Sequence, residues 1–333
     1  MKYKLPLLLT IGIASIIILL ILAGISPIEA FSQLIVSSLG SMRAIAGTLR
    51  NTTPLLVAGV AVYLALRAGL FNIGVEGQLI VGALAATCIA LNVTGFFGVI
   101  LAIIGGMLAG ALWALPAGLI KAYKGGHEVI TTIMLNNIAI HFTTAIVVGP
   151  MQDKTQEGPT TAFIDASTRL PHLFTLGNGA FYFNLALVFG IILLVLFTFW
   201  LKRSVGGYEL DAVGTNKTAA EYAGVKVQKT LVKAMFSSGA LAGLAGTLQV
   251  LAFEGRFFEG FSPGYGFDSL GVALLAGSNP LGILPSALVF GALDKGSASI
   301  QLFGVPKGFS HILLGLLIIV FAAYRYRRKP QNG

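Results

Sequence analysis

The sequence predicts an all-α polytopic membrane protein with about ten transmembrane segments, inverted repeats and discontinuous helices. Of its 333 residues, 56% are hydrophobic and only 11% are charged, whereas a soluble domain carries about 25% charged residues. Apolar runs of about 20 residues recur, and each can cross roughly 30 Å of hydrocarbon as a helix. A transmembrane β-barrel would instead show alternating segments of about 10 residues, which the sequence lacks.

The expected membrane segments follow one another along the chain. The first follows Lys2 and Lys4; a cleaved signal peptide is the alternative, but the apolar stretch is long for one and no clear Ala-x-Ala site follows. One later segment, 267–277, is too short to cross, because a spanning helix needs about 20 residues. The segments lie at residues 5–24, 52–67, 73–92, 96–122, 129–148, 183–201, 230–251, 267–277, 282–301 and 309–324.

The net charge of +9 is explained by membrane topology rather than by nucleic-acid binding, so no nucleic-acid partner is expected. Cytoplasmic loops of membrane proteins collect Lys and Arg, and most of the 22 basic residues fall on the inner side if both termini are cytoplasmic. This orientation places the polar stretch 149–182 outside and the basic stretch 202–229 inside. We expect the chain to lie in the cell (plasma or inner) membrane.

A weak internal repeat runs through what we expect to be a single transmembrane domain, residues 1–333. The stretch "RAGLFNIGVEGQLIVGALAA" at 67–86 is similar to "SPGYGFDSLGVALLAGSNP" at 262–280. The two stretches are offset by five segments, so the halves would run in opposite directions, as in many transporters. The alternative is chance similarity between two glycine-rich segments. The expected parts are an N-terminal helix and outer segment (1–50), a first repeat (51–148) and a second repeat (230–325).

The decapeptide "GLFNIGVEGQ", residues 69–78, interrupts the apolar chain with glycines, an amide and a carboxylate. Unpaired backbone groups cost several kcal/mol each in lipid, so a broken helix needs protein or a water-filled cavity around it. We expect Asn72 to cap the next helix and Glu76 to lie in its first turn, where the helix dipole favours a carboxylate. Asp268 in "GYGFDSLG" is the matching cap. The pattern indicates a discontinuous helix beside a translocation path; an ordinary short cytoplasmic loop is the alternative.

A second informative stretch is "VGTNKTAAEYAGVKVQK", residues 213–229, which is polar, basic and expected in the cytoplasm. Residues 218–225 can form a short helix with a small, smooth face made by Ala219, Ala220 and Ala223, ended by Gly224. Such a helix suits docking into a groove on another protein. A solvated loop is the alternative.

With these stretches, the chain resembles the permease subunits of ATP-binding-cassette (ABC) importers for simple sugars and nucleosides, in the superfamily of branched-chain amino acid permeases. The resemblance runs over roughly residues 40–325 and rests on "GLFNIGVEGQ", "HEVITTIMLNNIA" at 127–139, "GTNKTAAEYAGV" at 214–225 and "GFDSLGVALLAGSNPLGIL" at 266–284. The first two look most like the longer permease of the nucleoside-type branch. The sugar-type branch tends to show "GGIDLS" where this chain has "GLFNIG", which puts ribose-like sugars in doubt.

The resemblance implies several partners. The chain would form a heterodimer with a second, related permease; ABC ATPase subunits would dock underneath, and an extracytoplasmic substrate-binding lipoprotein would deliver the substrate. Residues 214–225 would be the coupling helix, so the residues expected at the ATPase interface are Gly214, Asn216, Ala219, Ala220, Tyr222 and Gly224.

The candidate residues of the translocation path are polar or aromatic groups in or beside the spans. Amides suit a ribose or a base edge because they both donate and accept hydrogen bonds, although contacts between helices are the alternative role. Aromatic rings can stack on a nucleobase. Asp294 and Lys295 are interpreted as a structural ion pair rather than a substrate contact. The path candidates are Phe71, Asn72, Glu76, Asn136, Asn137, Phe267 and Asp268.

The sequence offers no catalytic chemistry. It contains no GxxxxGK[ST], HExxH or GxSxG pattern and a single cysteine, so we expect no bound ATP, metal or cofactor, and hydrolysis by a partner subunit. Three alternatives remain: a permease for simple sugars, an ion-coupled secondary transporter that uses Glu76 or Asp294, and a membrane-embedded enzyme, for which no persuasive set of catalytic side chains exists.

Overall fold

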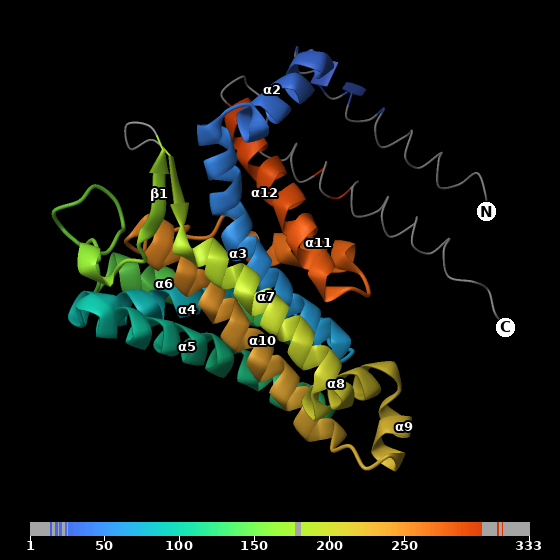
Figure 1. Ribbon diagram of the computed structural model, residues 1–333. Coiled ribbons are helices and arrows are strands. Elements are labelled where there is room, and N and C mark those ends of the chain that lie inside the picture. Colours follow the sequence, from blue (N-terminus) through green and yellow to red (C-terminus); the bar gives the residue numbers. More distant parts are fainter. Residues whose placement is uncertain are drawn as a thin grey trace.

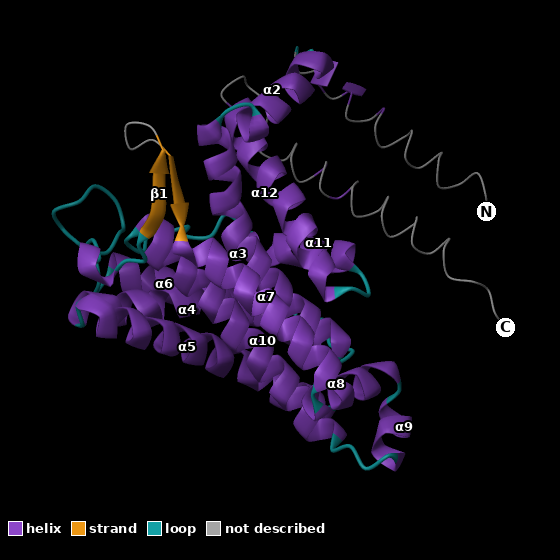
Figure 2. Ribbon diagram, in the orientation of Figure 1, coloured by secondary structure: helices purple, strands orange, loops and turns teal. Residues whose placement is uncertain are grey.

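The computed structural model describes residues 26–176 and 181–301, together with positions 14, 17, 18, 20, 21, 24, 312 and 315. This part is largely helical, with one small sheet (Figure 2). The expected segments at 5–24 and 309–324 lie almost entirely outside it. The elements are α2 (Pro27–Leu39), α3 (Met42–Arg67), α4 (Val75–Asn92), α5 (Gly95–Lys124), α6 (Glu128–Val148), η1 (Ala166–Thr168), β1 (His172–Leu176), β2 (Phe181–Asn184), α7 (Leu185–Arg203), α8 (Val205–Thr215), α9 (Lys217–Tyr222), α10 (Val227–Gln249), the π-helical turn η2 (Val250–Glu254), α11 (Tyr265–Ala276), η3 (Pro280–Gly282) and α12 (Ile283–Ile300).

Six of the described helices are long and apolar enough to cross a membrane: α3, α4, α5, α6, α7 and α10 with its η2 extension. The prediction of a polytopic helical membrane protein is therefore confirmed. Helix α11 is apolar but only 12 residues long, as expected for the short segment 267–277.

Helix α10 lies at the centre of the bundle and contacts α3, α4 and α5 (Figure 1). Its pair Gly239/Gly243 faces the pair Gly106/Gly110 of α5: a Cβ at Gly110 would lie 2.8 Å from the Gly243 Cα atom. The two GxxxG spacings in the sequence therefore mark a real interface, in which small residues let two membrane helices approach closely.

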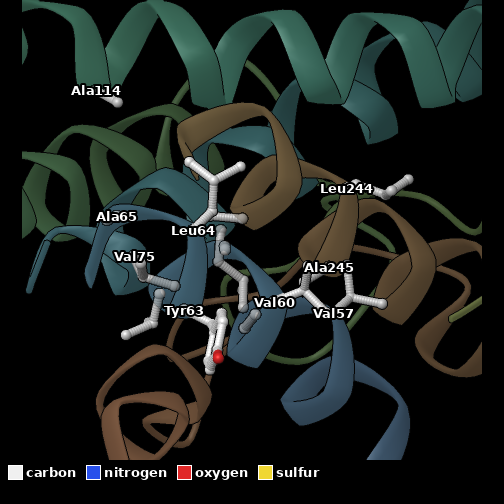
Figure 3. Packing of buried hydrophobic residues seen from close by; sticks show 14 of the residues in the cluster. Val57, Val60, Tyr63, Leu64, Ala65, Val75, Ala114, Leu244 and Ala245 are labelled. Carbon is white, nitrogen blue, oxygen red and sulfur yellow. The ribbon is translucent and has the colours of Figure 1, made fainter. Parts of the chain in front are cut away.

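The core is built around α3: 78% of the residues in its most apolar stretch are buried. Figure 3 shows Val57, Val60 and Tyr63 of this helix packed with Val75 of α4 and Ala245 of α10. Helices α5 and α6 lie at the edge of the bundle: only 28% and 22% of the residues in their most apolar stretches are buried. Their exposed side chains are mostly Ile, Leu, Met and Phe, which is the surface that a lipid-facing or partner-facing helix needs.

The all-α prediction is wrong for part of the polar stretch 149–182. Strands β1 and β2 pair in antiparallel register, with Thr175 opposite Tyr182. The sequences "HLFTL" and "FYFN" are rich in the aromatic and β-branched residues that favour strands. The preceding loop is tied to the segment after α10, where the Thr161 N–H donates to the Phe257 carbonyl over 2.9 Å. In this loop, the Ser167 hydroxyl and N–H donate to the Asp165 carboxylate and hold its pKa below the usual value.

The expected short span 52–67 is the second part of a longer helix. Helix α3 has 26 residues and begins at Met42, because the Ser41 hydroxyl caps it by accepting from the Ala44 N–H. Arg43 and Arg50, expected in an outer loop, lie on this helix, which also crosses the expected boundary between residues 50 and 51. The β-hairpin and the pair α8–α9 lie at opposite ends of the bundle (Figure 1).

Candidate functional site

The decapeptide 69–78 forms a buried break between two membrane helices. Helix α3 ends at Arg67, α4 begins at Val75, and Leu70 and Asn72 between them are 1% and 0% exposed. Gly69 has φ +71°, a left-handed conformation that residues with a side chain rarely adopt. A break inside the protein must pair its backbone polar groups with protein groups.

A cluster of amides fills this break. The Asn72 Oδ1 atom accepts from the Gly74 N–H (3.0 Å) and from Gln78 Nε2 (3.1 Å). Asn72 Nδ2 donates to Gln78 Oε1 (3.0 Å) and to the Ser238 hydroxyl of α10 (2.9 Å), which donates to the Ala61 carbonyl of α3 (2.7 Å). Asn72 thus links three helices. Our sequence analysis missed Gln78 and Ser238; Gln78, a buried amide inside an apolar span, was the available signal.

The cap of α4 comes from another helix. Asn136 of α6 accepts from the Gly77 N–H (2.9 Å) and donates to the Ile73 carbonyl (2.8 Å). Because Gly77 lies in the first turn, its N–H has no partner within the helix. Asn72 accepts from the N–H of Gly74, directly before α4, and Asn136 accepts from the N–H of Gly77 in the first turn, so the two amides share the start of α4. The neighbouring Asn137 is exposed and donates to the Ile133 carbonyl of its own helix.

Glu76 joins the first turns of the two segments that resemble each other in sequence. It is 3% exposed, and its Oε2 atom accepts from the Gly266 N–H of α11 over 2.6 Å. The backbones of Glu76 and Gly266 approach so closely that a side chain at position 266 would have no room. The positive ends of α4 and α11 thus lie at one carboxylate, which both helix dipoles stabilise.

The path candidates have different surroundings. Asn72, Glu76 and Asn136 are buried and meet at the break, while Phe71 and Asp268 are half-buried beside it. Phe267 is 46% exposed, so its ring is available to a ligand or to another chain. The structure therefore brings three of the seven together and places Asn137 and Phe267 on the surface.

A short helix forms close to the expected residues 218–225, as α9 (Lys217–Tyr222), and Asn216 caps it by accepting from the Ala219 N–H over 3.0 Å. Tyr222 is 90% exposed, and Ala219 and Gly224 are exposed as well. Ala220 is only 3% exposed and points into the protein. Of the small face expected from the sequence, Ala219 and Ala223 are on the surface and Ala220 is in the core.

Helix α8 ties this end of the protein to the buried break. Arg67, the last residue of α3, donates from Nε to the Asp211 Oδ1 atom over 2.6 Å, and its Nη2 atom pairs with the other carboxylate oxygen. Gly214 packs so tightly against the Arg67 carbonyl and Gly69 that a side chain there would clash with backbone. Gly214 therefore contacts the end of α3 on one side while it remains exposed on the other. Our sequence analysis missed Asp211.

Comparison with known proteins places this geometry in a family. Residues 44–322 match the family model described as branched-chain amino acid transport system / permease component. The guanosine ABC transporter permease protein NupP of Bacillus subtilis is 35% identical over 317 residues, which cover 94% of this chain and 90% of that protein.

Two further relatives cover similar lengths. The nucleoside ABC transporter permease protein NupB of Lactococcus lactis is 33% identical, over 92% of this chain and 86% of that protein. The glucose ABC transporter permease protein TsgB13 of Haloferax volcanii is also 33% identical, over 94% of this chain and 85% of that protein. The chain, a multi-pass membrane protein, therefore belongs to the family of branched-chain amino acid transport system permease components.

Proposed function

We propose that the chain is one permease subunit of an ATP-driven ABC importer for nucleosides. The observation that carries this proposal is the 35% identity to a guanosine permease along nearly the whole chain. A transport subunit of this kind supplies the path, while a separate ATPase supplies the energy. Simple sugars are the second candidate substrate, because a glucose permease is 33% identical over a similar length.

The partner in the membrane is a second, related permease. Lactococcus lactis, the source of NupB, also has a nucleoside ABC transporter permease protein NupC, which is 27% identical to this chain over 257 residues. The exposed face of α6 supports this pairing. It carries Asn137 and His141 one turn apart. Polar side chains on a membrane helix cost free energy when they face lipid, unless another protein chain or water contacts them. The path then runs along this face, between the two permeases.

The contact between α4 and α11 supports an inverted repeat. A Gly-aromatic-polar sequence precedes α4 and opens α11, and the Glu76 side chain of α4 accepts from the Gly266 N–H in the first turn of α11. In this arrangement about ten segments make up one transmembrane domain, residues 1–333, and the repeat halves move against each other during alternating access.

The two ends of the bundle have different partners. The exposed side of α9 (Asn216, Ala219, Tyr222 and Gly224) contacts the ATPase in the cytoplasm, where both termini lie. Lys121 and Lys202 lie in the last turns of α5 and α7, and Lys226 directly precedes α10; basic residues at these helix ends support this orientation. The opposite end, with the β-hairpin, receives the extracytoplasmic binding lipoprotein.

Uptake of labelled guanosine by cells that express the complete importer tests the substrate. We expect saturable uptake that other nucleosides compete with, that glucose does not, and that disappears when the chain is deleted. Competition by glucose but not by nucleosides would move the assignment to the sugar branch. Undiminished nucleoside uptake in the deletion strain, once other nucleoside carriers are removed, would contradict the proposal.

A further inference from the structure

A groove of about 430 Å³ lies where the C-terminal end of α5 meets α9 and the start of α10. Helices α5 and α10 pack closely near this end of the bundle (Figure 1), and a Cβ at Gly118 of α5 would come within 2.9 Å of the Met235 Cβ atom of α10. Tyr123 of α5 lines one side of the groove, and residues of α9 and α10 line the other. The groove is therefore a junction of two membrane helices with the short helix α9.

Positive charge dominates the groove and its edges. Lys226 and Lys229 line it, Lys124 is the last residue of α5, and Lys233 lies one turn beyond Lys229, all four with exposed side chains. Within the described part of the chain, none of these four lysines forms an ion pair. Among the described lining residues only Glu221 is acidic, so the groove and its edges keep an excess of positive charge.

The groove lies at the depth where membrane helices reach water. Lys229 and Lys233 lie in the first two turns of the span Val227–Glu254, and Tyr123 is the second-last residue of the span α5. Tyrosine and lysine are enriched at this level of membrane proteins, because each has an apolar stem and a polar tip. Cations at this level are attracted to the phosphates of anionic lipid headgroups.

An exposed apolar stripe on α5 leads to the groove. It consists of Leu101, Leu108, Leu112, Leu119 and Tyr123, each at least 41% exposed. Their spacings of four or seven residues place them on one side of the helix. An apolar stripe that ends at a cationic groove suits a molecule with both acyl chains and an anionic head.

We propose that this groove binds the phosphate of an anionic phospholipid headgroup, such as that of phosphatidylglycerol. Lys226 and Lys229 form charge-assisted hydrogen bonds with the phosphate oxygens, and the acyl chains lie along the stripe on α5. Inorganic phosphate shares the headgroup's chemistry but leaves the stripe uncovered. The site does not depend on which substrate the protein carries.

Native mass spectrometry of the full chain, purified with its partner subunits, tests the site. The complex is placed in phosphatidylcholine nanodiscs with increasing phosphatidylglycerol, and the retained phosphatidylglycerol is counted. We expect Lys226→Gln/Lys229→Gln to bind this lipid more weakly, by about fivefold for each cation removed. Lys226→Arg/Lys229→Arg keeps both charges and should retain the lipid. The matched control is Arg203→Gln/Lys217→Gln, which removes two exposed cations outside the groove and should also retain it.

Three results would overturn the proposal. In the first, Lys226→Gln/Lys229→Gln retains as much phosphatidylglycerol as the control; loss of the ATPase subunit from that variant would then assign the groove to a protein contact. In the second, the control loses as much lipid as the groove variant, which would mean that the lipid responds to overall surface charge. In the third, millimolar inorganic phosphate displaces the retained lipid completely, which would make the groove a site for free phosphate. Because the readout is bound lipid, a wrong assignment of the transported substrate would not affect it.

Discussion

Asn136 and Asn137 are adjacent amides with opposite environments. The first has a structural role, and the second is a candidate for the translocation path. Asn136 is buried and pairs with two backbone groups of the break, whereas Asn137 is exposed on α6. The sequence alone cannot distinguish them, because both lie in the middle of the same span. The distinction arises only when the first turn of α4 is placed against one side of α6.

We predict that Asn136→Leu destabilises the protein while Asn137→Leu does not. The first change leaves the Gly77 N–H and the Ile73 carbonyl buried without partners, at about 1–3 kcal/mol each. Thermal unfolding in detergent measures the difference. Asn137→Leu is the matched control for stability and should reduce uptake if its amide faces the path. Equal melting temperatures for the two variants would refute the capping role of Asn136.

Substitutions of Glu76 distinguish an ATP-driven importer from an ion-coupled carrier. In our account its carboxylate is structural, because it accepts from the Gly266 N–H. A glutamine keeps an oxygen acceptor of the same shape, so we expect Glu76→Gln/Asp294→Asn to retain part of the uptake. Glu76→Leu, which removes the acceptor, should lower the melting temperature. If the Glu76→Gln/Asp294→Asn variant folds but shows no uptake at all, ion coupling at these two carboxylates would be favoured.

At the scale of elements, α8 connects the surface helix α9 to the buried break. The Arg67–Asp211 pair and the tight contact of Gly214 with the end of α3 form this connection. A movement of α9 imposed by an ATPase would reach the Asn72 cluster through α8. The structure thus gives a short physical route from α9 to the break.

We predict that Arg67→Gln and Asp211→Asn uncouple ATP hydrolysis from transport and that their effects are not additive. Each single change breaks the same ion pair, so the double variant should be no worse than either alone. ATPase activity and uptake, measured on the same reconstituted complexes, give the ratio of nucleoside moved to ATP used. Additive losses in the double variant would mean that the two residues act separately.

A further prediction concerns the exposed side of α9. Ala219→Arg should abolish substrate-stimulated ATPase activity without lowering the melting temperature, because the new side chain points to the docking surface. Ala220→Arg should instead disturb the packing of α9, because Ala220 is 3% exposed. Gln228→Arg, exposed at the start of α10, is the control of equal charge. Normal stimulation in Ala219→Arg would remove α9 from the ATPase interface.

The membrane helices α4 to α7 and α10 and the break at 69–78 could be predicted from the sequence, because the order of apolar and polar residues along the chain indicates them. Long apolar runs predict α4 to α7 and α10, and the glycines and polar residues at 69–78 predict a break. The β-hairpin, the early start of α3 and the inward side of Ala220 could not be predicted, because they depend on tertiary contacts. The partner of Glu76 lies 190 positions away at Gly266 and is a backbone group, which leaves no trace in residue type.

At the scale of the whole molecule, the buried amides of Asn72, Gln78 and Asn136 and the carboxylate of Glu76 lie around the break between α3 and α4, whereas α5 and α6 are largely exposed. A rigid centre of α3, α4 and α10 carries the capping contacts, and the outer helices expose apolar side chains with a polar stripe. We propose that a partner in the membrane completes this subunit, with the path beside the stripe, so that the protein works as an assembly rather than as a single chain.

Gentle purification of the tagged full chain from its native membranes, followed by mass spectrometry of the proteins that come with it, tests that claim most directly. We predict the recovery of a second, related permease, an ATPase with a P-loop and a substrate-binding lipoprotein, in a complex that transports only with ATP. Recovery of the chain alone, still able to transport in liposomes under an ion gradient without ATP, would contradict the account.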